Sequence, residues 1–340
     1  MNMPNFFKIC VFLFFHIFIS CNSNRLKVDI SDVPEQKIEV SRLDRDLFTF
    51  DTVKPENFHF SMVKKYGSFY SNFITNIVNV GDQRDSVNVV LKKFVTDKDI
   101  LGSYHEIQQK YTDEKMLSLA NQLSTAMRYF KFHFPNNPSP KRYVSFISGF
   151  NYNIAPQDSV LGFGLDMYLG EQSKYYSMLQ WPKYKVHQMS EAYLVSDCMK
   201  GWIMYSFETN EPVNNLLSYM IRMGKIFYCL DAVLPELEDS VKIGYTKEQL
   251  KYCTNYEQNI WAYFTQKDRL FKTDMKELAD YSSDGPFTAA ISKECPPRIA
   301  AWVGWQIVRS YMNKNENVSL QELVNEKDIN KILNQSKYKP

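Results

Sequence analysis

One apolar stretch near the N-terminus divides this chain into a segment that is removed and a segment that folds. The stretch runs from Ile9 to Ile19 and follows Lys8, the only charged residue before position 21. Its 11 residues are too few for a membrane-spanning helix, which needs roughly 20, and suit a secretory signal, which needs roughly 7–15. Ser20 and Cys21 follow, and a small residue before such a cysteine is the bacterial lipobox arrangement. The sequence therefore predicts cleavage before Cys21 and lipidation of that cysteine, with an ordinary signal peptide as the alternative.

The predicted domain organisation follows from this cleavage site. Residues 1–20 are the lipoprotein signal peptide, residues 21–35 a polar and flexible tether, and residues 36–340 a single globular domain. Position 22 is Asn rather than Asp, which favours the outer membrane, and no acidic run follows, which favours its periplasmic leaflet. We therefore expect a domain held at that leaflet by a lipid anchor.

Composition limits the partners and predicts a large core. Removal of residues 1–20 takes away one positive charge, so the formal net charge falls from +2 to +1. A nearly neutral chain has no electrostatic footprint for nucleic acid. Aromatic residues make up 15% of the chain, which is far too rich for disorder. Four further cysteines lack a C-x-x-C spacing, and we expect free buried thiols, with disulfides as the alternative, at Cys198, Cys229, Cys253 and Cys295.

Hydrophobic periodicity predicts an α+β domain, mainly α-helical, with a small central antiparallel sheet. A short strand is expected at residues 38–44, and a helical pattern covers residues 55–134. Residues 142–147 and 159–167 are expected to form a hairpin, with Gly162 and Gly164 packed close to a neighbouring backbone. Five helix starts are then indicated: near residue 187, at Asn210-Glu211-Pro212, at the capping boxes of Thr246 and Ser319, and after Pro296-Pro297.

The familiar catalytic motifs are absent from the sequence. His105-Glu106 begins a zinc-helix pattern, but Gln109 stands where the second histidine is needed. His187 and Glu191 have the spacing of a hydrogen-bonded helical pair, without further ligands nearby. No G-x-S-x-G elbow occurs, and the acidic run at residues 236–239 is typical of a solvated loop. We therefore expect no catalytic residue, no metal and no cofactor.

The C-terminal third contains a face on which arginine alternates with tryptophan. Arg298, Trp302, Trp305 and Arg309 recur at i, i+4, i+7 and i+11, which is one side of a helix. The face could clamp a glycan or a protein partner through stacking and cation–π contacts. In the other interpretation, which we favour, the tryptophans are core residues and the arginines pair with buried acids such as Glu257.

In this region and elsewhere the chain resembles the gliding-motility lipoprotein GldB family of Bacteroidetes. The resemblance is carried by a series of short strings in a fixed order: Leu165-Asp166-Met167-Tyr168-Leu169-Gly170, Gly224-Lys225-Ile226, Ile243-Gly244-Tyr245-Thr246, Ile260-Trp261, residues 302–308 and residues 336–340. It implies an envelope lipoprotein without established catalytic activity. In gliding members the family belongs to the machinery that couples surface-adhesin movement to type IX secretion.

The family is also distantly similar to predicted zinc metallopeptidases, which implies a degenerate zincin-like architecture. In that comparison the metal-binding helix corresponds to residues 196–200, and Met223 replaces the glutamate that would supply the third ligand. Both ligand histidines are absent, and a thioether does not replace a carboxylate. The hypothesis is a binding role for the old cleft, with side chains contributed by Asp166, Tyr168, Asp197 and Lys225, beside the Glu257, Arg298, Trp302, Trp305 and Arg309 of the C-terminal third.

Two functional hypotheses result. The first is a non-enzymatic lipoprotein that binds other envelope proteins as an accessory or assembly factor. The second is a periplasmic hydrolase that acts on peptides or cell-wall glycans. Asp197 and Glu257 facing each other across an open cleft beside Arg298 would favour the hydrolase. Burial of both acids in ion pairs with Arg298 or Lys225 would favour the binding protein.

Overall fold

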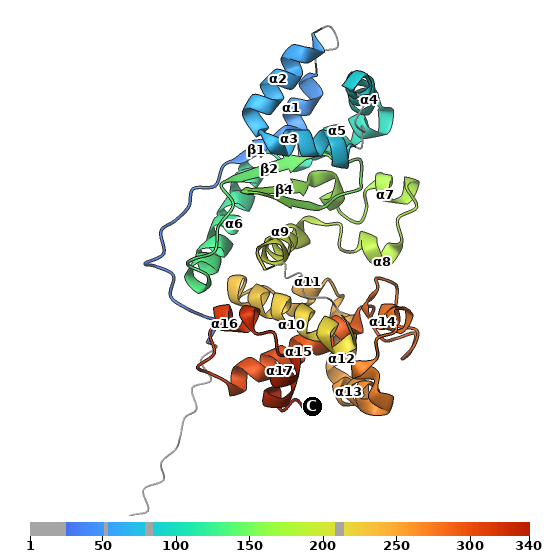
Figure 1. Ribbon diagram of the computed structural model, residues 1–340. Helices are drawn as coiled ribbons and strands as arrows, with labels where there is room; N and C mark the ends of the chain where they lie inside the picture. The colour runs from blue at the N-terminus through green and yellow to red at the C-terminus, as the bar shows by residue number, and fades with distance from the viewer. Residues whose placement is uncertain (1–24, 51–53, 79–83, 208–213) are drawn as a thin grey trace, which may run out of the picture.

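A computed structural model describes residues 25–50, 54–78, 84–207 and 214–340, without the side chains of residues 84–86. It confirms the α+β class, because most of the described chain is helical and a small four-stranded sheet lies among the helices. Figure 1 shows the sheet in the upper half of the molecule and a purely helical lower half. Helix α9 (Glu191–Ser206) lies between the two halves.

The sheet contains β1 (Val40–Arg42), β2 (Arg142–Phe146), β3 (Ile154–Gln157) and β4 (Val160–Gly164), in the order β1-β2-β4-β3. The short strand and both longer strands were predicted, but the sheet is mixed rather than antiparallel. β2 pairs in parallel with β1 and β4, and only β3 and β4 are antiparallel. The segment that was expected to connect β2 directly to β4 contains β3. The hairpin therefore forms between β3 and β4, with Asp158 in the left-handed region at its turn. A proline within β3 is tolerated because β3 is an edge strand.

Gly162 and Gly164 lie where the sequence predicted close backbone contact. A Cβ at Gly162 would lie 2.5 Å from the ring of Phe69, and one at Gly164 would lie 2.2 Å from the carbonyl oxygen of Tyr152. Only a residue without a side chain fits at either position.

Helices cover both faces of the sheet. Val144, Phe146 and Val160 pack against the N-terminal elements, whereas Leu161 and Phe163 belong to the larger core on the other face. That core contains α6 (Asp113–His133) and α9. The N-terminal elements are α1 (Leu43–Asp46), η1 (Leu47–Thr49), α2 (Pro55–Tyr66), α3 (Ser68–Asn72), η2 (Phe73–Ile77), α4 (Arg84–Thr96) and α5 (Lys98–Lys110).

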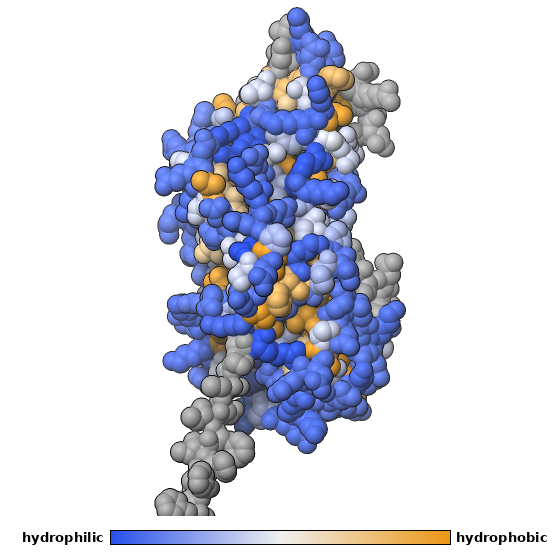
Figure 2. Space-filling model, turned by 90° about the vertical axis from the view of Figure 1, so that its left-hand side faces the viewer, coloured by the Kyte–Doolittle hydropathy of each residue, from blue (hydrophilic) through white to orange (hydrophobic). Residues whose placement is uncertain are grey.

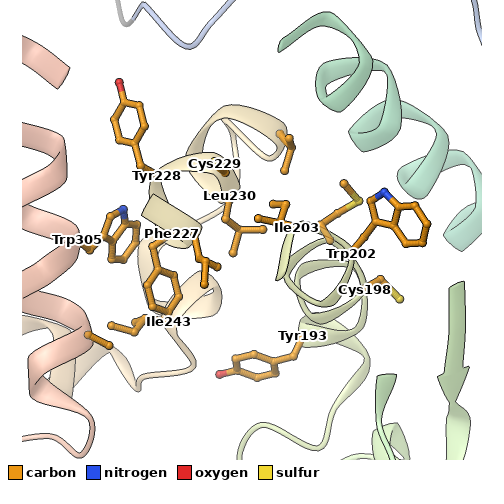
Figure 3. Close-up of a cluster of buried hydrophobic side chains, with 14 of the residues drawn as sticks. Tyr193, Cys198, Trp202, Ile203, Phe227, Tyr228, Cys229, Leu230, Ile243 and Trp305 are labelled. Carbon is orange, nitrogen blue, oxygen red and sulfur yellow. The ribbon is translucent and has the colours of Figure 1, made fainter. Parts of the chain in front are cut away.

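The lower half is built around two helices in close contact, α10 (Leu216–Val233) and α15 (Ile299–Lys314). A Cβ at Gly304 would lie 1.8 Å from the carbonyl oxygen of Met220, and a Cβ at Gly224 would lie 2.2 Å from that of Gly304. Figure 3 shows α10 between α9 and α15, with Ile203 and Leu230 in the space between α9 and α10. The remaining elements are η3 (Leu165–Tyr168), α7 (Lys174–Met178), α8 (Lys183–Val186), α11 (Asp239–Ile243), α12 (Lys247–Asn255), α13 (Glu257–Thr265), η4 (Gln266–Phe271), α14 (Met275–Ser282), α16 (Leu320–Asn325) and α17 (Ile329–Ser336).

Most of the predicted helix starts are confirmed. Thr246 and Ser319 form capping boxes with Gln249 and Glu322, and α15 begins two residues after Pro297. The helix expected from residue 187 begins at Glu191. The start expected at residues 210–212 lies outside the described residues, and α10 begins after a capping box at Asn215.

The described part of the predicted tether lies against the domain. Arg25 donates hydrogen bonds to the carbonyl oxygens of Met312 (2.7 Å) and Val318 (2.6 Å), and Leu26 is buried. Cys21 lies outside the described residues, four positions before Arg25. Among the helices that the structure describes, none is both long enough and apolar enough to cross a membrane.

All four cysteines of the described chain beyond the tether are buried free thiols, as expected. Burial raises the pKa of each thiol above its ordinary value. They therefore behave as small apolar core residues, not as nucleophiles.

Candidate functional site

The arginine–tryptophan face is closed inside the protein. Trp302 and Trp305 are core residues, 3% and 0% exposed, as favoured in the sequence analysis. The Arg309 guanidinium lies 3.9 Å from the Trp305 ring centroid. Arg309 pairs with acids as expected, but Glu257 is not one of them. It donates to both carboxylate oxygens of Asp231, at 2.8 Å each, and to those of Asp239, at 2.6 and 2.9 Å.

Lys242 and Trp305 complete this group, called here the ion-pair cluster: Asp231, Asp239, Lys242, Trp305 and Arg309. The Lys242 ammonium and the Trp305 indole N–H donate to opposite oxygens of Asp231, at 2.9 and 2.8 Å. Burial alone would raise the pKa of Asp239, but Arg309 and Lys242 lower it below its ordinary value. Asp239 is therefore paired and half-buried, which corrects the expectation of a solvated loop at this residue, while Glu236 and Glu238 are exposed as expected.

Two other predicted cleft residues lie elsewhere. Glu257 accepts a hydrogen bond from the Tyr338 hydroxyl at 2.7 Å, and Lys225 donates to the main-chain carbonyl of Glu326. The structure thus separates Lys225, Glu257, Trp302, Trp305 and Arg309 from the predicted cleft. The spacing of these residues in the sequence could not predict the separation, because side chains on α10, α13 and α15 point to different sides of each helix.

Three of the predicted residues do line one cavity, of about 310 Å³, between α9 and the loops before α9 and α15. They are Tyr168, Asp197 and Arg298. The cavity, called here the cleft, is lined by Asn151, Asn153, Met167, Tyr168, Trp181, Tyr184, Lys185, His187, Gln188, Met189, Asp197, Gly244, Thr246, Gln249, Asp284, Pro297 and Arg298. Its size falls at the lower end of ordinary ligand pockets.

Asp197 projects from the middle of α9 and is held from two sides. Lys200, one turn further along α9, donates to its Oδ1 at 2.8 Å, and the Tyr168 hydroxyl donates to its Oδ2 at 2.9 Å. Burial and the nearby carboxylate raise the pKa of Tyr168 well above its ordinary value, so this hydroxyl remains a donor. Both oxygens of Asp197 therefore have internal partners.

Arg298 reaches the cleft from the residue before α15. Its backbone is in the left-handed region (φ 55°), directly after Pro296-Pro297. The guanidinium forms an ion pair with Asp284 at 2.9 Å and donates to the carbonyl oxygen of Ile243 at 3.0 Å. Arg298 is therefore a neutralised, oriented part of the wall and not a residue on the α15 face.

Asp166 supports the cleft from behind. It is fully buried, and its Oδ2 accepts hydrogen bonds from the backbone N–H groups of Ser148 (3.0 Å) and Phe150 (2.6 Å). Burial raises the pKa of Asp166 to about 6, although the hydrogen bonds from these N–H groups act in the opposite direction and lower it. Phe150 has a φ of 64°, and the turn that Asp166 closes leads directly to Asn151 and Asn153 in the cleft wall.

The pairing expected between His187 and Glu191 does not form. The His187 Nδ1 lies 2.7 Å from Glu171, and its Nε2 lies 2.9 Å from the Tyr193 hydroxyl, while Glu191 pairs with Lys115 at 2.6 Å. The expectation was wrong because residues 187–190 precede α9 instead of continuing it.

A comparison with protein families identifies the chain. The family model described as gliding motility protein GldB matches residues 23–340. The chain belongs to the GldB family. No curated protein and no solved structure matches it.

In this GldB-family chain the helix compared with the zinc helix of metallopeptidases is α9. Its residues at the two histidine positions are Ser196 and Lys200, and Lys200 is used in the ion pair with Asp197. Within the ranges that the structure describes, no three His, Cys, Asp or Glu side chains are grouped as metal ligands.

Sequence reasoning missed several side chains of the cleft and one of the ion-pair cluster. Trp181, Tyr184 and the amides of the cleft carry no motif and come from separate loops. Asp231 did leave a signal, since it is the only charged residue in the apolar run at residues 226–233. A lone acid in a buried helical run requires a buried cation, and Arg309 and Lys242 supply it.

Proposed function

We propose that this GldB-family protein is a membrane-anchored envelope lipoprotein that acts without catalysis. Lipid on Cys21 would hold it at the periplasmic leaflet of the outer membrane. There it serves as an accessory or assembly factor for gliding-motility or type IX secretion-type machinery and contacts other envelope proteins. The cleft is its binding site for a further envelope component. The observation that carries the proposal is the family match over residues 23–340.

The attachment of the N-terminal segment supports a short anchor. Arg25 and Leu26 are docked on the domain, and four residues of extended chain span at most about 14 Å. In Figure 1 the described chain begins beside α16, and α8 of the cleft wall lies on the other side of the view.

The state of the predicted acids supports binding over hydrolysis. Asp197 lines the same cavity as Arg298, but both of its oxygens are occupied by Lys200 and Tyr168. Glu257 is bonded to Tyr338 and does not line the cleft. The sequence analysis considered two arrangements: Asp197 and Glu257 facing each other across the cleft, or both acids paired with Arg298 or Lys225. Neither is found in full, because Asp197 pairs with Lys200. Glu257, the second carboxylate named for the hydrolase, lies outside the cleft, and Asp284, another acid that lines the cleft, is paired with Arg298.

The direct test is the intact mass of the protein extracted from membranes, for wild type and Cys21→Ser. We expect the wild-type mass to equal residues 21–340 plus acyl chains, and the variant to lose both the acyl mass and the membrane fraction. An unmodified wild-type mass, or a variant that stays in the membrane, would contradict the anchor. Envelope proteins that co-purify with the wild type and not with detergent-matched controls would then identify the machinery.

A further inference from the structure

Most charged groups of the cleft already have internal partners. Asp197 is held by Lys200 and Tyr168, and Arg298 by Asp284, while the His187 ring is hydrogen-bonded to Glu171. A ligand group that displaced one of these pairs would leave a cleft charge without its partner, which is costly. Lys185 has no carboxylate partner among the described residues, and its ammonium lies 5.6 Å from the Trp181 ring centroid. The paired groups are therefore best met by uncharged polar groups of a ligand, and Lys185 adds one cation that no carboxylate neutralises.

The groups that remain for a ligand are neutral amides, and those of Gln188 and Gln249 are held in fixed orientations. Gln188 donates from Nε2 to the carbonyl oxygen of Gly244 at 2.8 Å, so its own oxygen is left as an acceptor. Gln249 accepts from the Thr246 N–H at 3.0 Å, so its amide N–H groups are left as donors. Asn151 is exposed at the end of the turn closed by Asp166. Such held amides pair well with hydroxyl groups, which both donate and accept.

Two half-buried aromatic side chains complete the wall. Trp181 and Tyr184 line the cleft from the segment that joins α7 to α8 and from α8 itself. Each combines an apolar ring with a polar edge, which suits a ligand that has both apolar faces and hydroxyl edges. A sugar ring has this character.

The cleft does not offer a strand edge to a peptide. None of its described lining residues belongs to β3, although β3 is the edge strand nearest in sequence to Asn153. A peptide that binds as an added strand needs main-chain hydrogen bonds to such an edge, so this mode of peptide binding is not available in the cleft. Side-chain amides and aromatic rings suit a carbohydrate, and a peptide is the rival ligand in the test.

We propose that the cleft binds an oligosaccharide, held by the amides of Gln188 and Gln249, with Asn151 beside them, and stacked on Trp181. The inference rests on the proposed function, since it names the class of envelope component that the cleft takes. It does not depend on the anchor at Cys21.

The test is calorimetric titration of the mature protein in detergent with the tetramer of N-acetylglucosamine. The matched probe is an uncharged tetraalanine peptide, blocked at both ends. We expect saturable binding of the tetrasaccharide only. Trp181→Ala should weaken it by about tenfold or more, while Trp181→Phe, which keeps a ring, should stay within about threefold of wild type. Trp261→Phe is the control, because Trp261 packs against Tyr338 and does not line the cleft.

The outcomes separate the two proposals. Absence of tetrasaccharide binding, or equal loss in Trp181→Ala and Trp261→Phe, would overturn the carbohydrate inference. Tighter binding of the peptide would also overturn it, while leaving the cleft as a binding site. Cleavage of the bound tetrasaccharide would support the ligand class and contradict the non-enzymatic function.

Discussion

The ion-pair cluster and the cleft use the same kinds of residue in opposite ways. At the centre of the cluster, the side chains of Asp231 and Lys242 are 7% and 4% exposed, and all their hydrogen bonds are internal, while Arg309 and Asp239 at its edge are 27% and 34% exposed. At the cleft neither pair is enclosed in this way, because Lys200 and Asp284 are 26% and 53% exposed, so water reaches one partner of each pair. Acid, base and aromatic ring are therefore structural where they are enclosed and available for recognition where one side stays open. The residue types alone do not distinguish the two roles.

The largest expected effect is in the cluster. Asp231→Ala removes the carboxylate that receives Arg309, Lys242 and Trp305, and it leaves the buried Lys242 and the partly buried Arg309 short of a partner. We expect the free energy of unfolding to fall by about 3–5 kcal/mol in urea denaturation. Lys247→Ala, which breaks an exposed pair with Glu238, should cost at most about 1 kcal/mol. Equal effects in the two variants would remove the distinction between enclosed and open pairs.

The next effect concerns the support of the cleft and depends on pH. Asp166 stays protonated in the folded protein up to a pKa of about 6, but in the unfolded chain only up to about 3.8. Folding therefore takes up a proton between these values, and this contribution to stability is lost as pH rises through 6. The unfolding free energy of wild type should fall by about 2 kcal/mol relative to Asp166→Asn between pH 4 and pH 7. Parallel pH profiles of the two proteins would contradict this origin.

A smaller effect is expected at the contact of α10 with α15. Gly304→Ala places a Cβ 1.8 Å from the carbonyl oxygen of Met220, so the helices must separate. We expect a loss of about 1–3 kcal/mol in the free energy of unfolding. Gly285→Ala, where the nearest atom lies at 3.6 Å, is the control and should leave the unfolding midpoint unchanged. If Gly304→Ala is as stable as wild type, close packing of these helices is not what supports the cluster.

The smallest effect on stability is expected in the cleft itself. Asp197→Ala frees Lys200, which is 26% exposed and becomes hydrated, and removes the acceptor of the Tyr168 hydroxyl. The cost should be about 1–2 kcal/mol, well below that of Asp231→Ala. Thermal unfolding of both variants in one buffer compares them directly. A larger loss in Asp197→Ala than in Asp231→Ala would reverse the assignment of the two regions.

The sequence predicted elements better than their arrangement. The capping boxes at Thr246 and Ser319 are local hydrogen-bond patterns, so they appear in the structure where expected. The mixed sheet was not predicted, because the pairing of β2 with β1 and β4 depends on contacts between residues far apart in the chain.

The candidate site was predicted only in part for a similar reason. Tyr168, Asp197 and Arg298 do meet in one cleft, and Asp166 lies behind it. Arg309 was correctly expected to pair with an acid, but helical spacing could not identify Asp231 on another helix. The cleft aromatics come from a segment whose short helices, α7 and α8, have no clear periodicity to read.

Hydrogen–deuterium exchange of the mature protein, with and without the tetramer of N-acetylglucosamine, tests the division between enclosed cluster and open cleft most directly. We expect peptides of α10 and α15 to exchange slowest and to be unchanged by the sugar, because their amides open only with global unfolding. Peptides covering residues 174–188 should exchange faster and become protected when the sugar binds. Protection that appears in α10 and α15, or that is absent from residues 174–188, would contradict the account.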